Sequence, residues 1–262
     1  MIRLTSLFCI IAIAITSSSL LADTKLPFKP GEKLLYKISY SKIISAGKGL
    51  LEVRTHPEPS LNNTIYEFII QGRSVGLIGK LYPIEDITKS VFDIKTMLEI
   101  RSNINIREND YRKTKELKFN RATDEVEYKA DSNPVETFKV KSDTQGPFSI
   151  LYLLRANMDR LVNKKELTFS VFDAGKLYDM KLKYIGKKMI KLKLGKVDTY
   201  EVNASLKTDG VFRNKGKITV WISADESHVP IKVRTKLLIG SIYSTLDEFH
   251  NVEIKFESDT IR

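Results

Sequence analysis

Alternation of apolar and polar residues is the dominant pattern along this chain. Apolar residues, with Ser102 and Thr235 as exceptions, occupy every second position in segments 34–40, 98–106, 167–171, 180–184, 192–194, 218–222, 231–235 and 252–256. Successive side chains of a strand point to opposite faces, so this spacing is typical of antiparallel strands with one buried face. Combinations of glycine, proline, asparagine and aspartate separate the segments and indicate turns. We expect roughly twelve to fifteen strands.

One segment has helical spacing instead. After Pro147, apolar or long side chains recur three and four residues apart at Phe148, Leu151, Tyr152 and Arg155, and proline is favoured at the first position of a helix. The sequence therefore predicts a mainly β fold, an antiparallel curved sheet, open barrel or sandwich, with one central helix over about 147–162. Residues 77–82 contain a glycine and are not expected to form a firm helix.

The N-terminus has the features of a secretory signal. Arg3 precedes an apolar run over residues 7–15, and Ala22 provides a small residue for cleavage. The run of about nine apolar residues is shorter than the roughly 20 of a membrane helix, which argues against the alternative of a retained anchor. We expect a signal peptide over residues 1–22 and a single β-rich exported domain over 23–262, located in the periplasm. The one cysteine, Cys9, belongs to the signal.

The charge of the chain narrows the classes of partner that it can be expected to bind. The formal net charge is +11, and 42% of the residues are hydrophobic. An exported basic protein meets anionic lipids rather than nucleic acid, so we expect a lipid or lipopolysaccharide-like amphiphile, or an envelope protein, as partner. Lysines on the solvated face of a sheet are the simpler explanation of the same charge. His56, His228 and His250 lack metal-ligand spacing, so neither a metal nor a cofactor is expected.

Several segments together resemble a known family. Residues 28–36, which read FKPGEKLLY, are followed in order by 148–155 (FSILYLLR), 173–178 (DAGKLY) and 221–225 (WISAD). In this order they are similar to a family of bacterial exported proteins, the domain of unknown function 3108. The resemblance implies an envelope protein with a β-rich fold, and it implies no catalytic residues.

One motif invites a catalytic interpretation. Gly72, Ser74 and Gly76 match the G-x-S-x-G pattern in which a serine nucleophile stands between a strand and a helix. Either His228 or His250 follows in the chain order of a hydrolase triad. That fold needs helices alternating with strands, which this chain lacks, so a hydrolase using Ser74 is a remote alternative to a glycine-assisted bend.

The aromatic residues of the predicted strands are the preferred candidates for binding. In an open curved sheet they could line a groove for an acyl chain, whereas in a closed sandwich they would fill the core. The candidate groove residues are Tyr36, Tyr40, Phe68, Tyr184 and Trp221. The leading hypothesis is a non-enzymatic periplasmic protein that binds an apolar or amphipathic envelope component, such as a lipid. The alternative is a structural or partner-binding envelope module without a ligand.

Overall fold

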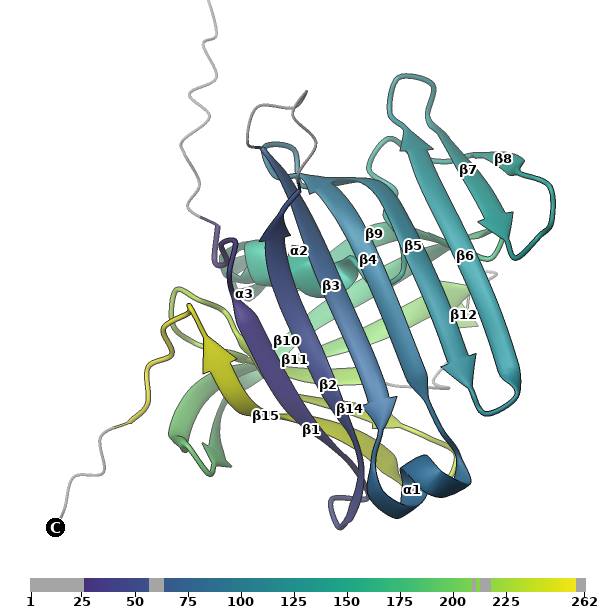
Figure 1. The fold of residues 1–262 in the computed structure, drawn as a ribbon. Coiled ribbons are helices and arrows are strands. Elements are labelled where there is room, and N and C mark those ends of the chain that lie inside the picture. Colours follow the sequence, from purple (N-terminus) through teal and green to yellow (C-terminus); the bar gives the residue numbers. More distant parts are fainter. Residues whose placement is uncertain (1–25, 57–63, 209–210, 213–217, 258–262) are drawn as a thin grey trace, which may run out of the picture.

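Long antiparallel strands make up most of the structure (Figure 1). The computed structural model describes residues 26–56, 64–208, 211–212 and 218–257, so the predicted signal lies outside the described residues. The first arm comprises β1 (Lys33–Tyr40), β2 (Ile44–Thr55), β3 (Ile65–Ser74), β4 (Glu85–Asp93), β5 (Leu98–Glu108), β6 (Tyr111–Asn120), β7 (Glu125–Ala130) and β8 (Glu136–Lys139). The second comprises β9 (Glu166–Asp173), β10 (Lys176–Leu192), β11 (Gly195–Thr208), β12 (Val211–Phe212), β13 (Ile218–Ser223), β14 (Pro230–Lys236) and β15 (Ser241–His250). The helices are α1 (Gly76–Leu81), α2 (Ile150–Ala156) and α3 (Met158–Lys164).

The two arms form one continuous sheet whose middle joins the two ends of the chain. The strand order is β8-β7-β6-β5-β4-β3-β2-β1-β15-β14-β13-β11-β10-β9, and β12 pairs with β11. The pairing of β1 with β15 sets Lys33 opposite His250 and Tyr40 opposite Ile242. Apart from β12, each arm is otherwise a meander of sequence neighbours, so within the sheet the pairing of β1 with β15 joins the two arms.

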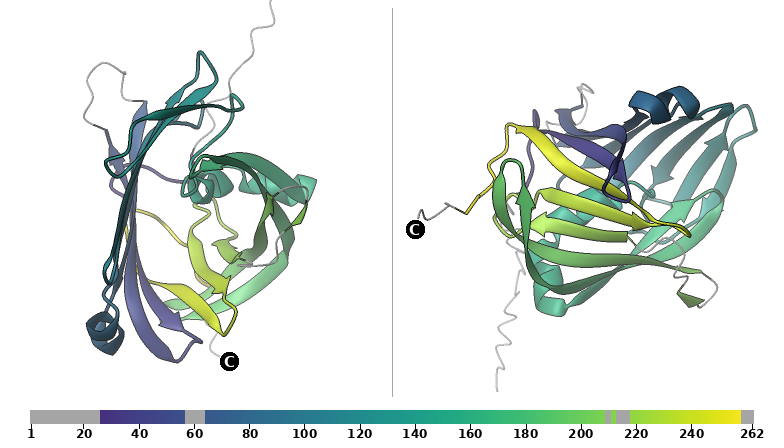
Figure 2. Two further views of the ribbon diagram at one scale, coloured as in Figure 1. Left: turned by 90° about the vertical axis from the view of Figure 1, so that its right-hand side faces the viewer. Right: turned by 90° about the horizontal axis from the view of Figure 1, so that it is seen from below.

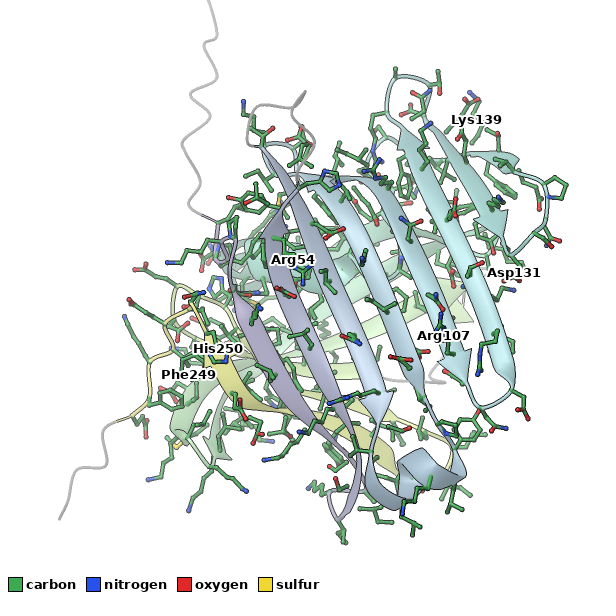
Figure 3. All side chains as sticks on the ribbon, in the orientation of Figure 1. Arg54, Arg107, Asp131, Lys139, Phe249 and His250 are labelled. Carbon is green, nitrogen blue, oxygen red and sulfur yellow. The ribbon has the colours of Figure 1, made fainter. Side chains whose placement is uncertain are left out.

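The sheet is curved, as the sequence predicted. Figure 2 shows a gently bent first arm and a second arm that curls around α2 and α3. The edge strand β9 returns to the first arm, where Phe172 packs with Leu117 and Tyr128 and Lys115 of β6 pairs with Asp173 at 2.7 Å. The side of the sheet that faces α2 and α3 is called the inner face below, and the opposite side the outer face. On the first arm the outer face carries charged side chains such as Arg54 and Arg107 (Figure 3).

The helices differ from the prediction in two respects. The single helix expected over 147–162 is broken at Asn157, which has φ −113° and ψ 18° and separates α2 from α3. The side-chain amide of Asn157 donates to the carbonyl of Leu153, a local bond with which asparagine competes against helix continuation. The expectation that 77–82 is not helical is also wrong, since α1 forms there. The amide of Val75 donates to Ala46 of β2, so tertiary contacts support this short helix.

Apolar side chains of α2 and α3 fill one part of the inner face. Leu154, Met158 and Leu161 are buried against the second arm, where they meet Val202 and Ile222. On the first arm the ring of Tyr152 stacks on Phe68, with centroids 3.9 Å apart and planes at 15°. Burial of each such side chain contributes roughly 1.5–3 kcal/mol, so the helix pair holds the two arms together from inside.

A buried ion pair fixes the position of α2. The side chain of Arg155 is 0% exposed and that of its partner Glu32 is 1% exposed. The same guanidinium donates to the carbonyls of Pro27, Ser227 and His228, at 2.9, 3.0 and 3.1 Å. One side chain therefore ties the helix to the segment before β1 and to the turn between β13 and β14.

A second buried carboxyl fixes the segment that leads into α2. Glu99 of β5 is fully buried and accepts hydrogen bonds from the amide of Gly146 and, at 2.7 Å, from the hydroxyl of Ser149. An added Cβ on Gly146 would lie 2.7 Å from the Glu99 carboxylate, so only glycine allows this approach. Burial raises the pKa of Glu99 above its ordinary value, although the bonds from Ser149 and Gly146 offset part of the increase.

Loss of the Glu32 charge is expected to destabilise the fold strongly. Glu32→Gln leaves the buried Arg155 cation unpaired, which costs about 3–5 kcal/mol of unfolding free energy. The double variant Glu32→Leu with Arg155→Met should recover much of this loss, because it removes both buried charges. Urea unfolding followed by circular dichroism measures each value. The exposed pair of Lys118 and Glu127 provides the control, since Lys118→Gln should change stability within about 0.5 kcal/mol. An equal loss in Glu32→Gln and Lys118→Gln would contradict the anchoring role.

The buried Glu99 carboxyl predicts a specific pH dependence. Its folded-state pKa is raised, so its contribution to stability is fully present below the ordinary value of 4.5 and is lost as pH rises through the folded-state pKa. Glu99→Gln removes this titration and keeps an acceptor for Gly146 and Ser149. The stability of the variant relative to the parent protein should therefore increase between about pH 4 and 7. Urea midpoints across this range measure it, and a difference that does not vary with pH would show that Glu99 does not titrate as described.

Candidate functional site

The helices cover only part of the inner face. The phase of β3 places Phe68, Ile70 and Gly72 on this face, because Phe68 stacks on α2 and the register has no shift along the strand. Phe68 is buried under α2, whereas Ile70 and Gly72 are half-exposed. The inner face therefore changes along a single strand from a packed core to a surface that is partly accessible.

The partly accessible region continues across both arms. It consists mainly of apolar and glycine residues that are partly exposed, although their side chains or Cα hydrogens point inward with the core residues of the same strands. We call it the open inner face, and it comprises Ile38, Gly49, Ile70, Gly72 and Ile106 on the first arm and Ile218, Val233 and Ile242 on the second. Isoleucine is usually buried in cores, so this set of partly exposed side chains marks apolar surface that the helices leave accessible.

Two paired glycines lie within the open inner face. Gly49 of β2 is the register partner of Gly72 of β3. A Cβ added at Gly72 would find no heavy atom within 4 Å, whereas one at Gly49 would lie 3.5 Å from the Cβ of Tyr36. Open space therefore adjoins the sheet at Gly72, and the missing side chains leave room for atoms that are not part of the chain.

The open inner face offers mainly apolar contacts. Its defining residues are aliphatic or glycine. The neighbouring inner-face positions add hydroxyls, at Thr88, Thr235 and Ser244, and charged side chains, at Asp86 opposite Gly72 and at Lys113 opposite Ile106. Within the described part of the chain there is no group of three or more histidine, cysteine, aspartate or glutamate residues that could hold a metal ion. The arrangement can bury an apolar chain and offer it a few hydrogen bonds.

The structure does not bring the five predicted groove residues together. Tyr36 and Phe68 are on the inner face but are buried in the core, and the hydroxyl of Tyr36 donates to Pro230 at 2.7 Å. Tyr184 is partly buried against the cluster formed by α2, α3 and the second arm, and its ring centroid lies 5.8 Å from that of Tyr200. Tyr40 lies at the end of β1, where its hydroxyl donates to Ile239 at 3.1 Å.

Trp221 corrects the prediction most clearly, because it lies on the outer face. Its neighbours Val220 and Ile222 belong to the inner core, so the strand alternation points Trp221 the other way. Its indole N–H donates to Glu201 at 3.0 Å, and Lys188 and Arg234 lie 5.7 and 5.6 Å from its ring. The alternation of Ile218, Val220 and Ile222 in the sequence already indicates that Trp221 points to the face opposite these three residues.

Ser74 stands between β3 and α1, as the G-x-S-x-G pattern would require. Its hydroxyl donates to the carbonyl of Tyr82 at 3.1 Å and accepts from the amide of Ile84 at 2.8 Å. His228 lies beside α2, where its imidazole contacts the carbonyl of Arg155 at 3.1 Å. These bonds give Ser74 a role in shaping the turn around α1, and a hydrolase that uses Ser74 stays the remote alternative described above.

Strand order and curvature place the chain among the β-barrel-like open sheets. A crystal structure of a β-barrel-like protein of the domain of unknown function DUF1849 from Brucella abortus matches with a TM-score of 0.57 and 12% identity, covering 83% of this chain and 96% of that one. This similarity shows the fold.

The described helices include none with the length and hydrophobicity needed to cross a membrane.

The family follows from the sequence itself. The model of a family of proteins of unknown function, DUF3108, matches residues 35–247, so the chain belongs to the DUF3108 family. This confirms the resemblance found in the sequence. None of the curated proteins matches the chain.

Two further solved structures are similar at lower scores. An exported protein with a YmcC-like fold from Bacteroides fragilis has a TM-score of 0.36 and 10% identity, covering 86% of this chain and 98% of that one. The lipoprotein LppX from Mycobacterium tuberculosis has a TM-score of 0.29 and 13% identity, covering 86% of this chain and 89% of that one. Of these two structures, the first is described as an exported protein and the second as a lipoprotein.

Proposed function

We propose that this protein binds an apolar or amphipathic component of the cell envelope, such as a lipid, on the open inner face and without catalysis. The observation that carries the proposal is the set of partly exposed isoleucines on the face that adjoins open space at Gly72. Exposed apolar surface is unfavourable in water by roughly 25 cal/mol per Å². A bound acyl chain would remove this cost, and curved apolar surfaces are common ligand sites.

The distribution of charge supports an amphipathic ligand. The residues that define the open inner face are uncharged, Asp86 and Lys113 border it on the first arm, and the outer face of β13 and β14 carries Lys232 and Arg234 around Trp221. An acyl chain would lie against the isoleucines, and an anionic head group would remain near basic side chains at the border of the sheet.

Export to the periplasm is part of this proposal. It rests on Arg3, the apolar run over residues 7–15 and Ala22, all outside the described residues. The absence of catalysis is proposed because the hydroxyl of Ser74, the one candidate nucleophile that the sequence offered, bonds to backbone groups of its own turn.

The test is to fill the open space at Gly72. Gly72→Phe introduces a side chain where a Cβ meets no atom within 4 Å, so the protein should fold normally while its ligand space shrinks. We expect its affinity for a fluorescent fatty acid, dansyl undecanoate, to fall about tenfold or more, which corresponds to 1.4 kcal/mol or more. Gln71→Phe is the matched control, because residue 71 is the next position of β3 and points to the outer face.

Two results would contradict the proposal. If the parent protein does not bind the probe, the chain is better described as a structural or partner-binding envelope module without a ligand. If Gly72→Phe and Gln71→Phe bind equally well, a lipid site exists elsewhere. Thermal unfolding of all three proteins establishes that the comparison concerns folded chains.

A further inference from the structure

Three segments with exposed apolar side chains lie at one end of the molecule. They are the turn between β1 and β2, the turn between β14 and β15, and α1, which Figure 1 places at the lower end of the sheet. Ile43, Leu238 and Ile239 are 89%, 95% and 80% exposed, and Leu77 and Leu81 of α1 are 70% exposed. We call Ile43, Ile44, Leu77, Leu81, Leu237, Leu238 and Ile239 the apolar tips.

Hydrogen bonds hold these segments next to one another. The amide of Ser41 donates to Ser241 at 2.8 Å, and the hydroxyl of Tyr40 donates to Ile239 at 3.1 Å. On the other side, the amide of Val75 donates to Ala46 at 3.1 Å and thereby joins α1 to β2. The apolar tips are therefore one group in space, although they come from three parts of the chain.

The backbone is shaped to present the tip of the β14–β15 turn. Gly240 has φ +73°, and a Cβ there would lie 2.7 Å from the hydroxyl oxygens of Ser41 and Tyr40. Glycine is thus needed both for its conformation and for the close approach of the two turns. Since Leu237, Leu238 and Ile239 precede it, the packed side of the turn faces β1 and the leucines point into solvent.

Single exposed leucines are common on protein surfaces, but contiguous apolar patches mark interaction sites. A protein partner would require a continuous, well-packed interface. Separate projecting tips match that requirement poorly, whereas the interfacial region of a lipid bilayer accepts them without shape complementarity. The form of the patch therefore favours a membrane surface.

Basic side chains next to the apolar tips give this end a positive outer face. Lys42 and Lys232 lie 5.5 and 5.2 Å from the ring of Tyr243, and Arg234 lies 5.6 Å from the ring of Trp221. Lys188 lies 5.7 Å from the same ring, and the Glu201 carboxylate is 3.7 Å from the Lys188 amine. Burial lowers the pKa of Lys232, and repulsion from Lys42, Lys188 and Arg234 lowers it further, as expected where cations gather.

Basic groups also flank α1. Lys80 lies in its last turn, and Arg73, Arg107 and Arg112 line a pocket beside it together with one acid, Glu85. The apolar tips are thus bordered by cations on both sides, which is the arrangement that favours anionic lipid surfaces over neutral ones.

We propose that the protein docks on an anionic lipid bilayer through this end, with the apolar tips inserted at the interface and the flanking lysines and arginines on lipid phosphates. This surface is distinct from the open inner face, so either proposal can fail while the other holds. Ile242 follows the β14–β15 turn and belongs to the open inner face, so a docked molecule would have its open inner face next to the membrane.

Binding to vesicles tests the docking surface. The chain from residue 23 onward, which contains every described residue, is sedimented with vesicles of phosphatidylethanolamine and phosphatidylglycerol and with vesicles of phosphatidylcholine. We expect binding to the anionic vesicles that weakens with salt. Leu238→Asp should reduce it about tenfold or more, because it places a charge at the interface. Val135→Asp is the matched control, since residue 135 is also exposed and apolar but lies between β7 and β8.

Several outcomes separate this inference from its alternatives. Equal vesicle binding by Leu238→Asp and Val135→Asp would overturn the role of the apolar tips, and equal binding to both kinds of vesicle without salt dependence would overturn the role of the cations. Ile43→Asp, in the adjacent turn, serves as a second variant if Leu238→Asp fails to fold. Leu238→Asp should still bind dansyl undecanoate, so failure of docking is distinguishable from failure of the inner-face site.

Discussion

The buried ion pair between Arg155 and Glu32 is the interaction on which the rest of the structure depends. A guanidinium removed from water is tolerated only where its donors are satisfied and its charge is neutralised. Here Glu32 supplies the charge, while carbonyls before β1 and in the turn between β13 and β14 supply further acceptors. The helix α2 is thereby fixed to the middle of the sheet, where β1 and β15 join the two arms.

The position of α2 and α3 divides the inner face into two parts. Near the helices, Tyr152 and Leu154 fill the space between the arms with close-packed side chains. Farther along the same strands α2 and α3 no longer cover the face, and aliphatic residues remain partly exposed beside the Gly49 and Gly72 pair. A stable core and an accessible apolar surface thus coexist on one sheet. The packed part provides the stability that allows the other part to remain unfilled.

Local patterns predicted the elements that depend on local chemistry. Strand alternation predicted the curved antiparallel sheet, and the spacing from Phe148 to Arg155 predicted a central helix. The break at Asn157 was missed, because a side-chain bond to the helix backbone competes with continuation and leaves no periodic signal. The α1 helix was missed for the opposite reason, since contacts with β2 stabilise a segment whose own propensity is weak.

The candidate site was less predictable than the fold. Trp221 was assigned to the groove because it is aromatic, although the phase of its strand points it outward. The pairing of Arg155 with Glu32 joins residues that are far apart in the sequence, so nothing local reveals it. The openness at Gly72 depends on where α2 ends in space. The open space at Gly72 can be recognised only once the positions of both arms and of the helix pair are known.

The central claim is that the part of the inner face beyond the helices receives an apolar chain. Photo-crosslinking with a diazirine fatty acid, followed by mass spectrometric mapping of the modified peptides, tests it most directly. The account predicts adducts on residues around Ile38, Ile70 and Gly72 and on Val233 or Ile242, lost when an unlabelled fatty acid competes. Adducts confined to the outer face, or an unmodified inner face under saturating probe, would contradict it.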